Sequence, residues 1–196
     1  DAEKAYQLKP DDIDVLLLLQ DIALREDQYD KAAEYIEKAK KLQPNEVRPY
    51  QAAAALEMKR FAAEKGGDKQ KHFDNALAQI DQGLKNVSGA KGMELLFFKA
   101  ELQIAQDTAG ARQTIRELGE HRGLRSEVVD YFEARILLAE GKWFQASEAL
   151  NRIRPQIADF GRERAMEVDY SLGLCYERLG QYDLAKEKYE LVLQQD

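Results

Sequence analysis

The chain is poor in the residues that build disulfides, metal sites and membrane spans. It has one cysteine, Cys175, which lies in an apolar run, so no disulfide can form within the chain and we expect a buried thiol. The two histidines, His72 and His121, have no metal-ligand spacing; we expect both in exposed loops and predict no metal site. The longest apolar run, Val15 to Leu19, is far shorter than the roughly 18 residues of a membrane span.

The chain also has few prolines and no net positive charge. Only four prolines, with 44% apolar and 33% charged residues, exclude a disordered chain and favour a water-soluble, helix-rich protein. The net charge of −7 comes without a basic stripe, because acidic residues balance even the arginine-rich stretch 112–164. We therefore expect no nucleic-acid partner and no membrane insertion. The compartment stays open, with the cytoplasm favoured.

No motif in the chain indicates catalysis. Gly66 and Gly67 are followed by Asp68 and Lys69, without the Lys-Ser/Thr pair of a phosphate-binding loop. Carboxylates are abundant, but their spacing does not distinguish an acid-base pair from an ordinary helix surface. We expect neither enzymatic activity nor a cofactor.

The features that are present repeat along the chain, most clearly near its end. The last unit contains Leu172, Gly173, Tyr176, Gly180, Gln181, Tyr182, Ala185 and Tyr189. Leu172, Gly173 and Tyr176 share one face of a helix, where a glycine permits close approach of a second helix. Ala185 is its expected small partner, Gly180 the expected turn, and Tyr182 an aromatic wedge in that turn.

This pattern resembles the tetratricopeptide repeat, in which two short helices surround a tight turn. Pro10 and Pro44 lie 34 positions apart (44 − 10), which is the period of that family. The resemblance implies an all-α, right-handed superhelix (α-solenoid) of about five helical hairpins.

Five alanines place the returning helix of each unit: Ala32, Ala76, Ala111, Ala146 and Ala185. They predict one repeat domain over 1–196, in which 1–10 ends a preceding repeat and the repeats span 11–44, 45–88, 89–123, 124–160 and 161–196. The segments 61–72 and 155–163 lengthen two connections, as flexible spacers or as accessory contacts. Because the pattern opens inside a repeat and stops before a terminal proline, we expect a fragment of a longer protein.

Individual units leave some positions open. Met93 to Gln106 is predicted to be helical, but Phe97, Phe98, Ala100 and Leu102 permit two registers one residue apart. In the fourth unit Trp143 takes the place of Tyr182 as a wedge, and Pro155 is expected to end the returning helix.

The resemblance also implies a binding surface, the concave side lined by the first helix of each hairpin. The predicted groove residues are Leu17, Asp21, Gln51, Met58, Leu96, Gln103, Tyr131, Arg135, Tyr170, Leu174 and Glu177. The cationic clamp with which many relatives hold a peptide carboxylate is not matched, since Asp21 stands where a cation is needed. We expect a largely apolar groove that binds an apolar or amphipathic protein segment.

Two alternatives to such a non-catalytic scaffold stay open. The array could be the targeting or regulatory arm of a larger multidomain enzyme. It could also be a self-association module, because the apolar residues of the last hairpin, including Leu184, Tyr189 and Leu193, could pair in a homodimer.

Overall fold

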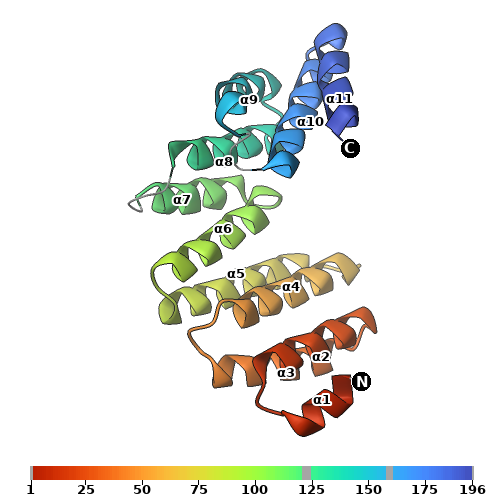
Figure 1. Ribbon diagram of the computed structural model, residues 1–196, viewed down its shortest axis with the longest axis vertical. Coiled ribbons are helices and arrows are strands. Elements are labelled where there is room, and N and C mark those ends of the chain that lie inside the picture. Colours follow the sequence, from red (N-terminus) through yellow and green to blue (C-terminus); the bar gives the residue numbers. More distant parts are fainter. Residues whose placement is uncertain (1, 121–124, 158–160, 196) are drawn as a thin grey trace. The chain divides into compact units, whose positions relative to one another are not determined.

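The computed structural model describes residues 2–120, 125–157 and 161–195, and these residues form helices and connecting turns without any strand (Figure 1). The helices are α1 (Ala2–Leu8), α2 (Ile13–Arg25), α3 (Tyr29–Leu42), α4 (Arg48–Ala63), α5 (Lys69–Asn86), α6 (Ala90–Ile104), α7 (Thr108–Gly119), α8 (Ser126–Ala139), α9 (Trp143–Ile157), α10 (Arg162–Arg178) and α11 (Tyr182–Gln195). The all-α prediction is confirmed. None of the described helices has the length and apolar character to cross a membrane.

The helices pack as successive hairpins within two compact units, Asp1–Lys99 and Ala100–Asp196. In the first unit α2 pairs with α3 and α4 with α5, while α3 contacts α4. In the second, α8 pairs with α9 and α10 with α11, while α9 contacts α10 (Figure 1). Each predicted repeat from 11–44 to 161–196 coincides with two consecutive helices. That these repeats form one domain of a longer protein stays a prediction.

Three hairpins turn by the same backbone motif. The residue after each first helix's C-cap is left-handed, with φ of 56° at Asp27, 69° at Gly141 and 74° at Gly180. The next amide then donates to the carbonyl five residues earlier, for example Gln181 N–H to the Tyr176 carbonyl at 2.8 Å. This Schellman geometry satisfies carbonyls that the helix end would leave unpaired. The aromatic wedge begins the returning helix two residues later, at Tyr29, Trp143 and Tyr182.

The alanines that mark the returning helices are all buried. The five are Ala32, Ala76, Ala111, Ala146 and Ala185. The core is a series of local clusters: Leu16, Leu19 and Tyr35 join α2 to α3, whereas Ala23, Ile36 and Leu56 carry the contact on to α4. A core of this kind is typical of a repeat protein, in which each hairpin contacts mainly its neighbours.

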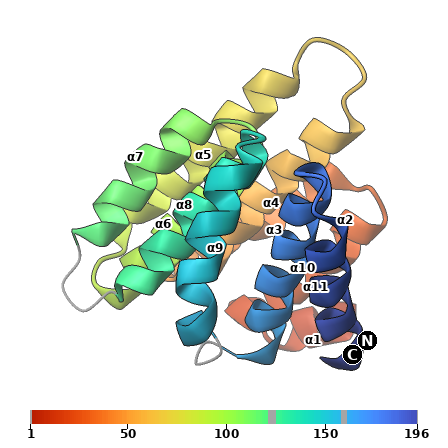
Figure 2. The same ribbon diagram turned by 90° about the horizontal axis from the view of Figure 1, so that it is seen from above.

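The extra residues of segment 61–72 are mostly helical, contrary to the expectation of a long loop. They extend α4 to 16 residues and α5 to 18, against 13 and 14 for α2 and α3. Only residues 64–68 connect the two helices, and this loop stands out at the top of Figure 2. The extension is held by buried Phe73 and by Lys69, whose Nζ lies 5.4 Å from the centre of the Phe61 ring.

Pro155 does not end its helix, as the sequence predicted, because α9 continues to Ile157. The proline ring removes one backbone hydrogen bond, but Ile153 and Ile157 lie one turn apart on the same face and are both buried. Burial of this face offsets the missing bond. Part of the predicted connection 155–163 lies outside the described residues.

Gly173 is buried against Tyr189 and not against its expected partner Ala185. A Cβ on Gly173 would lie 2.5 Å from the nearest atom of the Tyr189 ring. The close approach was predicted correctly, but the side chain that uses it is aromatic. Of the three wedges, Tyr29 and Trp143 are half-buried, whereas Tyr182 is 69% exposed.

Candidate peptide-binding surface

The first four predicted groove residues lie on α2 and α4. Leu17 is half-buried against the core cluster of Leu16 and Tyr35. Gln51 and Met58 are half-buried on α4, and Asp21 is exposed on α2. This face therefore mixes small apolar areas with polar ones.

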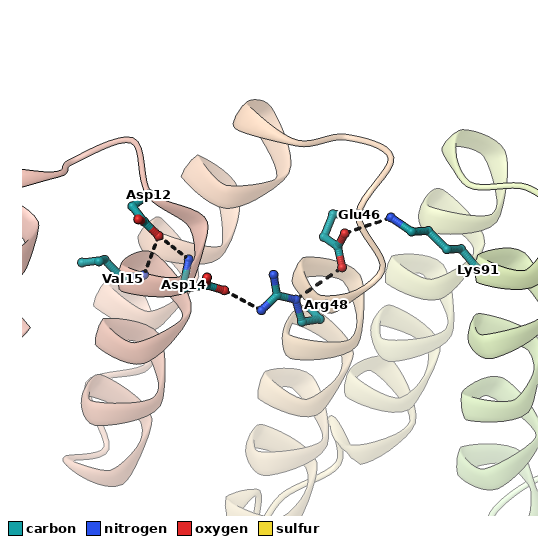
Figure 3. A network of polar contacts seen from close by, with 6 residues as sticks. All are labelled: Asp12, Asp14, Val15, Glu46, Arg48 and Lys91. Carbon is teal, nitrogen blue, oxygen red and sulfur yellow. Dashed lines mark hydrogen bonds and ion pairs between the residues drawn. The ribbon is translucent and has the colours of Figure 1, made fainter.

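A ladder of ion pairs runs beside this face, from α2 across the start of α4 to α6 (Figure 3). The Asp14 carboxylate lies 2.6 Å from Arg48, which contacts Glu46 at 3.3 Å, and Glu46 lies 3.0 Å from Lys91. The hydrogen bond from Lys91, together with that from Arg48, lowers the pKa of Glu46. Asp14 and Arg48 are exposed and 34 positions apart, so the ladder links neighbouring repeats at the surface.

Two registers were possible for α6, and the structure adopts the one that was not assumed when the groove residues were predicted. Leu96 and Gln103 are both buried, and Gln103 accepts a hydrogen bond from the Thr114 hydroxyl at 2.7 Å. They belong to the core and are not available to a partner. The neighbouring face carries Phe97 and Glu101 instead, each partly exposed.

Tyr131 on α8 is also buried, at 4% exposure, and does not project as an anchor. The guanidinium carbon of Arg164 lies 4.9 Å from its ring centre and that of Arg135 lies 5.6 Å away. Arg164 also donates to the Tyr131 hydroxyl oxygen at 2.8 Å. Burial, and then interaction with Glu167, raises the pKa of Tyr131 to about 12, so the phenol stays protonated at neutral pH.

The predicted groove residue Arg135 is already paired within the chain. It is hydrogen-bonded to Glu101, which lies 34 positions earlier, and its Nε lies 3.8 Å from Glu167. The guanidinium is thus shared between two carboxylates on the flanking helices. Oppositely charged residues one period apart, as here and in the Asp14–Arg48 pair, are the sequence signal that could have identified these contacts.

The most accessible predicted residues lie on α10. We define the α10 strip by its members on one face of the helix, which are Glu163, Glu167, Tyr170, Leu174 and Glu177. Tyr170 is 55% exposed and its ring centre lies 5.8 Å from that of Tyr189. The Tyr189 hydroxyl donates to Glu177 at 2.9 Å. The strip combines an exposed aromatic ring, a half-buried leucine and exposed carboxylates.

The remaining candidates do not form a reaction centre in the described part of the chain. His72 is not an exposed loop residue but lies in the first turn of α5, 2.9 Å from Glu57, whereas His121 lies outside the described residues. Cys175 is buried as predicted, and burial raises the pKa of its thiol to about 11. The described residues contain no group of three or more His, Cys, Asp or Glu side chains placed to hold a metal ion.

Comparison with solved structures finds similar chains over nearly the whole length. The MamA protein superposes with a TM-score of 0.54, at 15% identity over 93% of this chain and 91% of MamA. YrrB, described as a TPR protein with an unusual peptide-binding site, gives 0.51 at 13% identity over 100% of this chain and 92% of YrrB. This chain has a tetratricopeptide-like repeat fold.

Other comparisons set the limits of this likeness. A human IFIT1 dimer with m7Gppp-AAAA superposes with a TM-score of 0.50 at 17% identity, over 92% of this chain but only 46% of IFIT1. No protein-family model matches the sequence. No curated protein matches it either. At these identities the tetratricopeptide-like fold is shared, and function has to be argued from the surface of this chain.

Proposed function

We propose that this tetratricopeptide-like chain is a non-catalytic scaffold that binds a segment of another protein on the exposed faces of its first helices. The observation that carries the proposal is the α10 strip, where Tyr170 is 55% exposed beside half-buried Leu174 on a long helix. Tyrosine supplies a large contact area at a low cost in conformational entropy, and it is enriched among residues that dominate binding energy.

The packing of the scaffold also supports the proposal. Every buried side-chain nitrogen or oxygen among the described residues has a hydrogen-bond partner. The ion pair of Arg135 with Glu101 and the hydrogen bond from Arg164 to Tyr131 hold neighbouring first helices together. A partner segment would therefore meet preformed helices, and the free-energy cost of ordering the scaffold on binding would be small.

The decisive experiment is selection from a display library of short random peptides against the complete chain. Recovered peptides are tested for binding to the wild type, to Tyr170→Ala and to Tyr182→Ala. Tyr182 is a matched control, because it is an exposed tyrosine on α11 outside the strip. Binding that Tyr170→Ala weakens by about tenfold and Tyr182→Ala leaves unchanged supports the proposal. Failure of the wild type to retain any peptide rejects it.

RNA is a poorer fit than a peptide, although the superposed IFIT1 structure contains m7Gppp-AAAA. The chain has a formal net charge of −7, and three of the five residues of the α10 strip are glutamates. These carboxylates repel a phosphate backbone. We expect no binding of a capped oligonucleotide at physiological salt, measured by fluorescence anisotropy with the same protein preparation.

Self-association is the second candidate function, and a separate observation favours it. Leu193 on α11 is 74% exposed and Leu184 on the same helix is also exposed. A large contiguous patch of exposed apolar side chains is typical of a contact surface. Sedimentation over a range of concentrations tests this: a dimer that Leu193→Glu converts to monomer supports it, and a monomer at every concentration rejects it.

A further inference from the structure

Tyr170 occupies in the last hairpin the position that Tyr131 occupies in the hairpin before it. Both tyrosines lie on first helices, and their separation of 39 positions (170 − 131) equals that of the marker alanines Ala146 and Ala185 (185 − 146). Their surroundings differ, because Tyr131 is 4% exposed and Tyr170 is 55% exposed. The group that covers the Tyr131 ring therefore indicates which chemical group could cover the Tyr170 ring.

The ring of Tyr131 is covered by an arginine. The guanidinium of Arg164 lies 4.9 Å from the ring centre, donates to the hydroxyl oxygen at 2.8 Å and contacts Glu167 at 3.2 Å. A tyrosine ring and a neighbouring carboxylate together form a seat for a guanidinium, since the ring face and the carboxylate are both negative and the guanidinium is planar.

Tyr170 and the neighbouring Tyr189 bring together the same two components, an aromatic ring and a carboxylate. Its neighbour is a second ring, that of Tyr189, at 5.8 Å between centres and 47° between planes. Glu177 is exposed and is held in place by the hydrogen bond from the Tyr189 hydroxyl. Burial, with that hydrogen bond next in importance, raises the pKa of Tyr189 to about 12, so the phenol keeps donating at neutral pH.

The charge around this seat favours a cation from outside the chain. Glu163 and Glu167 are exposed on the same face of α10 as Tyr170 and Glu177. Two arginines of α10 already have partners: Arg164 contacts Tyr131 and Glu167, and Arg178 lies over the ring of Trp143 at 5.6 Å.

We propose that Tyr170, Tyr189 and Glu177 bind an arginine side chain of a partner protein segment, with Leu174 receiving an apolar side chain beside it. The inference rests on the peptide-binding function proposed above and names the chemistry of its ligand. Arginine suits the seat better than lysine, because its planar group can stack on a ring while it donates two parallel hydrogen bonds to Glu177.

The test uses the random-peptide library selected against the complete chain. The selected peptides are expected to be enriched in arginine. Each arginine is then replaced in turn by citrulline, which keeps the shape and removes the charge. One replacement should weaken binding to the wild type by about tenfold, and the same replacement should have little effect on binding to Tyr170→Ala.

Three variants control for loss of structure. Tyr170→Phe keeps the ring and should retain binding, Glu177→Gln removes the charge and should weaken it, and Tyr182→Ala should behave as wild type. Helical circular dichroism and the melting temperature establish that each variant is folded.

Peptides that bind without any dependence on arginine, or whose arginine is equally important in the wild type and in Tyr170→Ala, overturn the arginine seat and leave the scaffold function standing. Absence of any peptide binding to the wild type overturns both.

Discussion

The ring of Tyr189 lies directly against Gly173, where a Cβ would come within 2.5 Å of one ring atom and 2.7 Å of another. This contact brings α11 close to α10 and places the Tyr189 hydroxyl at Glu177. The glycine therefore fixes both the packing of the last hairpin and one wall of the proposed arginine seat.

Gly173→Ala should destabilise the chain by about 2 kcal/mol, because the added methyl group must displace an aromatic ring in a packed interface. Chemical denaturation monitored by circular dichroism measures the loss. Gly67→Ala is the matched control, because a Cβ at Gly67 meets nothing within 4 Å. Combining Gly173→Ala with Tyr189→Leu should recover part of the loss. Equal stability of the two alanine variants would contradict the close contact.

Two of the left-handed turn residues, Gly180 and Asp27, should respond to substitution in opposite directions. Gly180 has φ of 74° and open space around a potential Cβ, so Gly180→Ala should cost about 1 kcal/mol through backbone strain alone. Asp27 adopts φ of 56° with a side chain, so Asp27→Gly should relieve strain and be neutral or slightly stabilising. Thermal denaturation of the two variants side by side gives the signs.

The hairpin organisation could be predicted from the sequence because it depends on local sterics. The alanines of the returning helices, the turn at Gly180 and the aromatic residues that follow each turn are determined by one or two neighbouring turns of helix. The alanines are buried and Gly180 is a left-handed turn residue, as predicted, whereas the predicted wedge Tyr182 is exposed.

The register of α6 could not be predicted, because adjacent apolar pairs at 95–96 and 97–98 fit both choices. The structure buries Leu95, Leu96 and Ala100 and leaves Glu101 to pair with Arg135. The register of α6 therefore depends on a contact with the neighbouring repeat, and the sequence pattern of α6 alone carries no information about that contact.

The sequence prediction was wrong in two further places, one segment and one residue. The Lys- and Gly-rich segment 61–72 suggested a loop, but burial of Phe73 makes most of it helical. Tyr131 was predicted to be an anchor because of its residue type and its face of the helix, yet Arg164 from the next hairpin covers it. Both outcomes depend on tertiary contacts.

Glu57 should make stability depend on pH in the acid range. Burial alone would raise the pKa of this carboxyl, but hydrogen bonds from His72 and Asn75 and the charge of Arg60 outweigh burial and lower the pKa below its ordinary 4.5. A lowered folded-state pKa stabilises the protein above the unfolded-state value. This stabilisation is lost as the pH falls through the folded-state value.

Glu57→Gln should therefore be clearly less stable than the wild type at neutral pH, and the difference should shrink as the pH falls below about 4.5. Urea denaturation at a series of pH values measures it. A stability difference that is the same at neutral and acidic pH would contradict the assignment.

The ion pair that joins α9 to α10 should behave as a buried pair and not as a surface one. Arg154 donates two hydrogen bonds of 2.7 Å to the two oxygens of Asp169, and Asp169 is 1% exposed. Surface pairs contribute at most about 1 kcal/mol, whereas removing one partner of a buried pair leaves a charge without compensation.

Arg154→Leu should therefore cost about 3 kcal/mol, because it leaves the Asp169 carboxylate buried and unpaired. The double variant Arg154→Leu/Asp169→Leu should regain most of that loss, since an apolar pair pays no desolvation of charge. Urea denaturation of the two single variants and the double variant gives the coupling energy. A double variant as unstable as the sum of the single variants would show that the two side chains act independently.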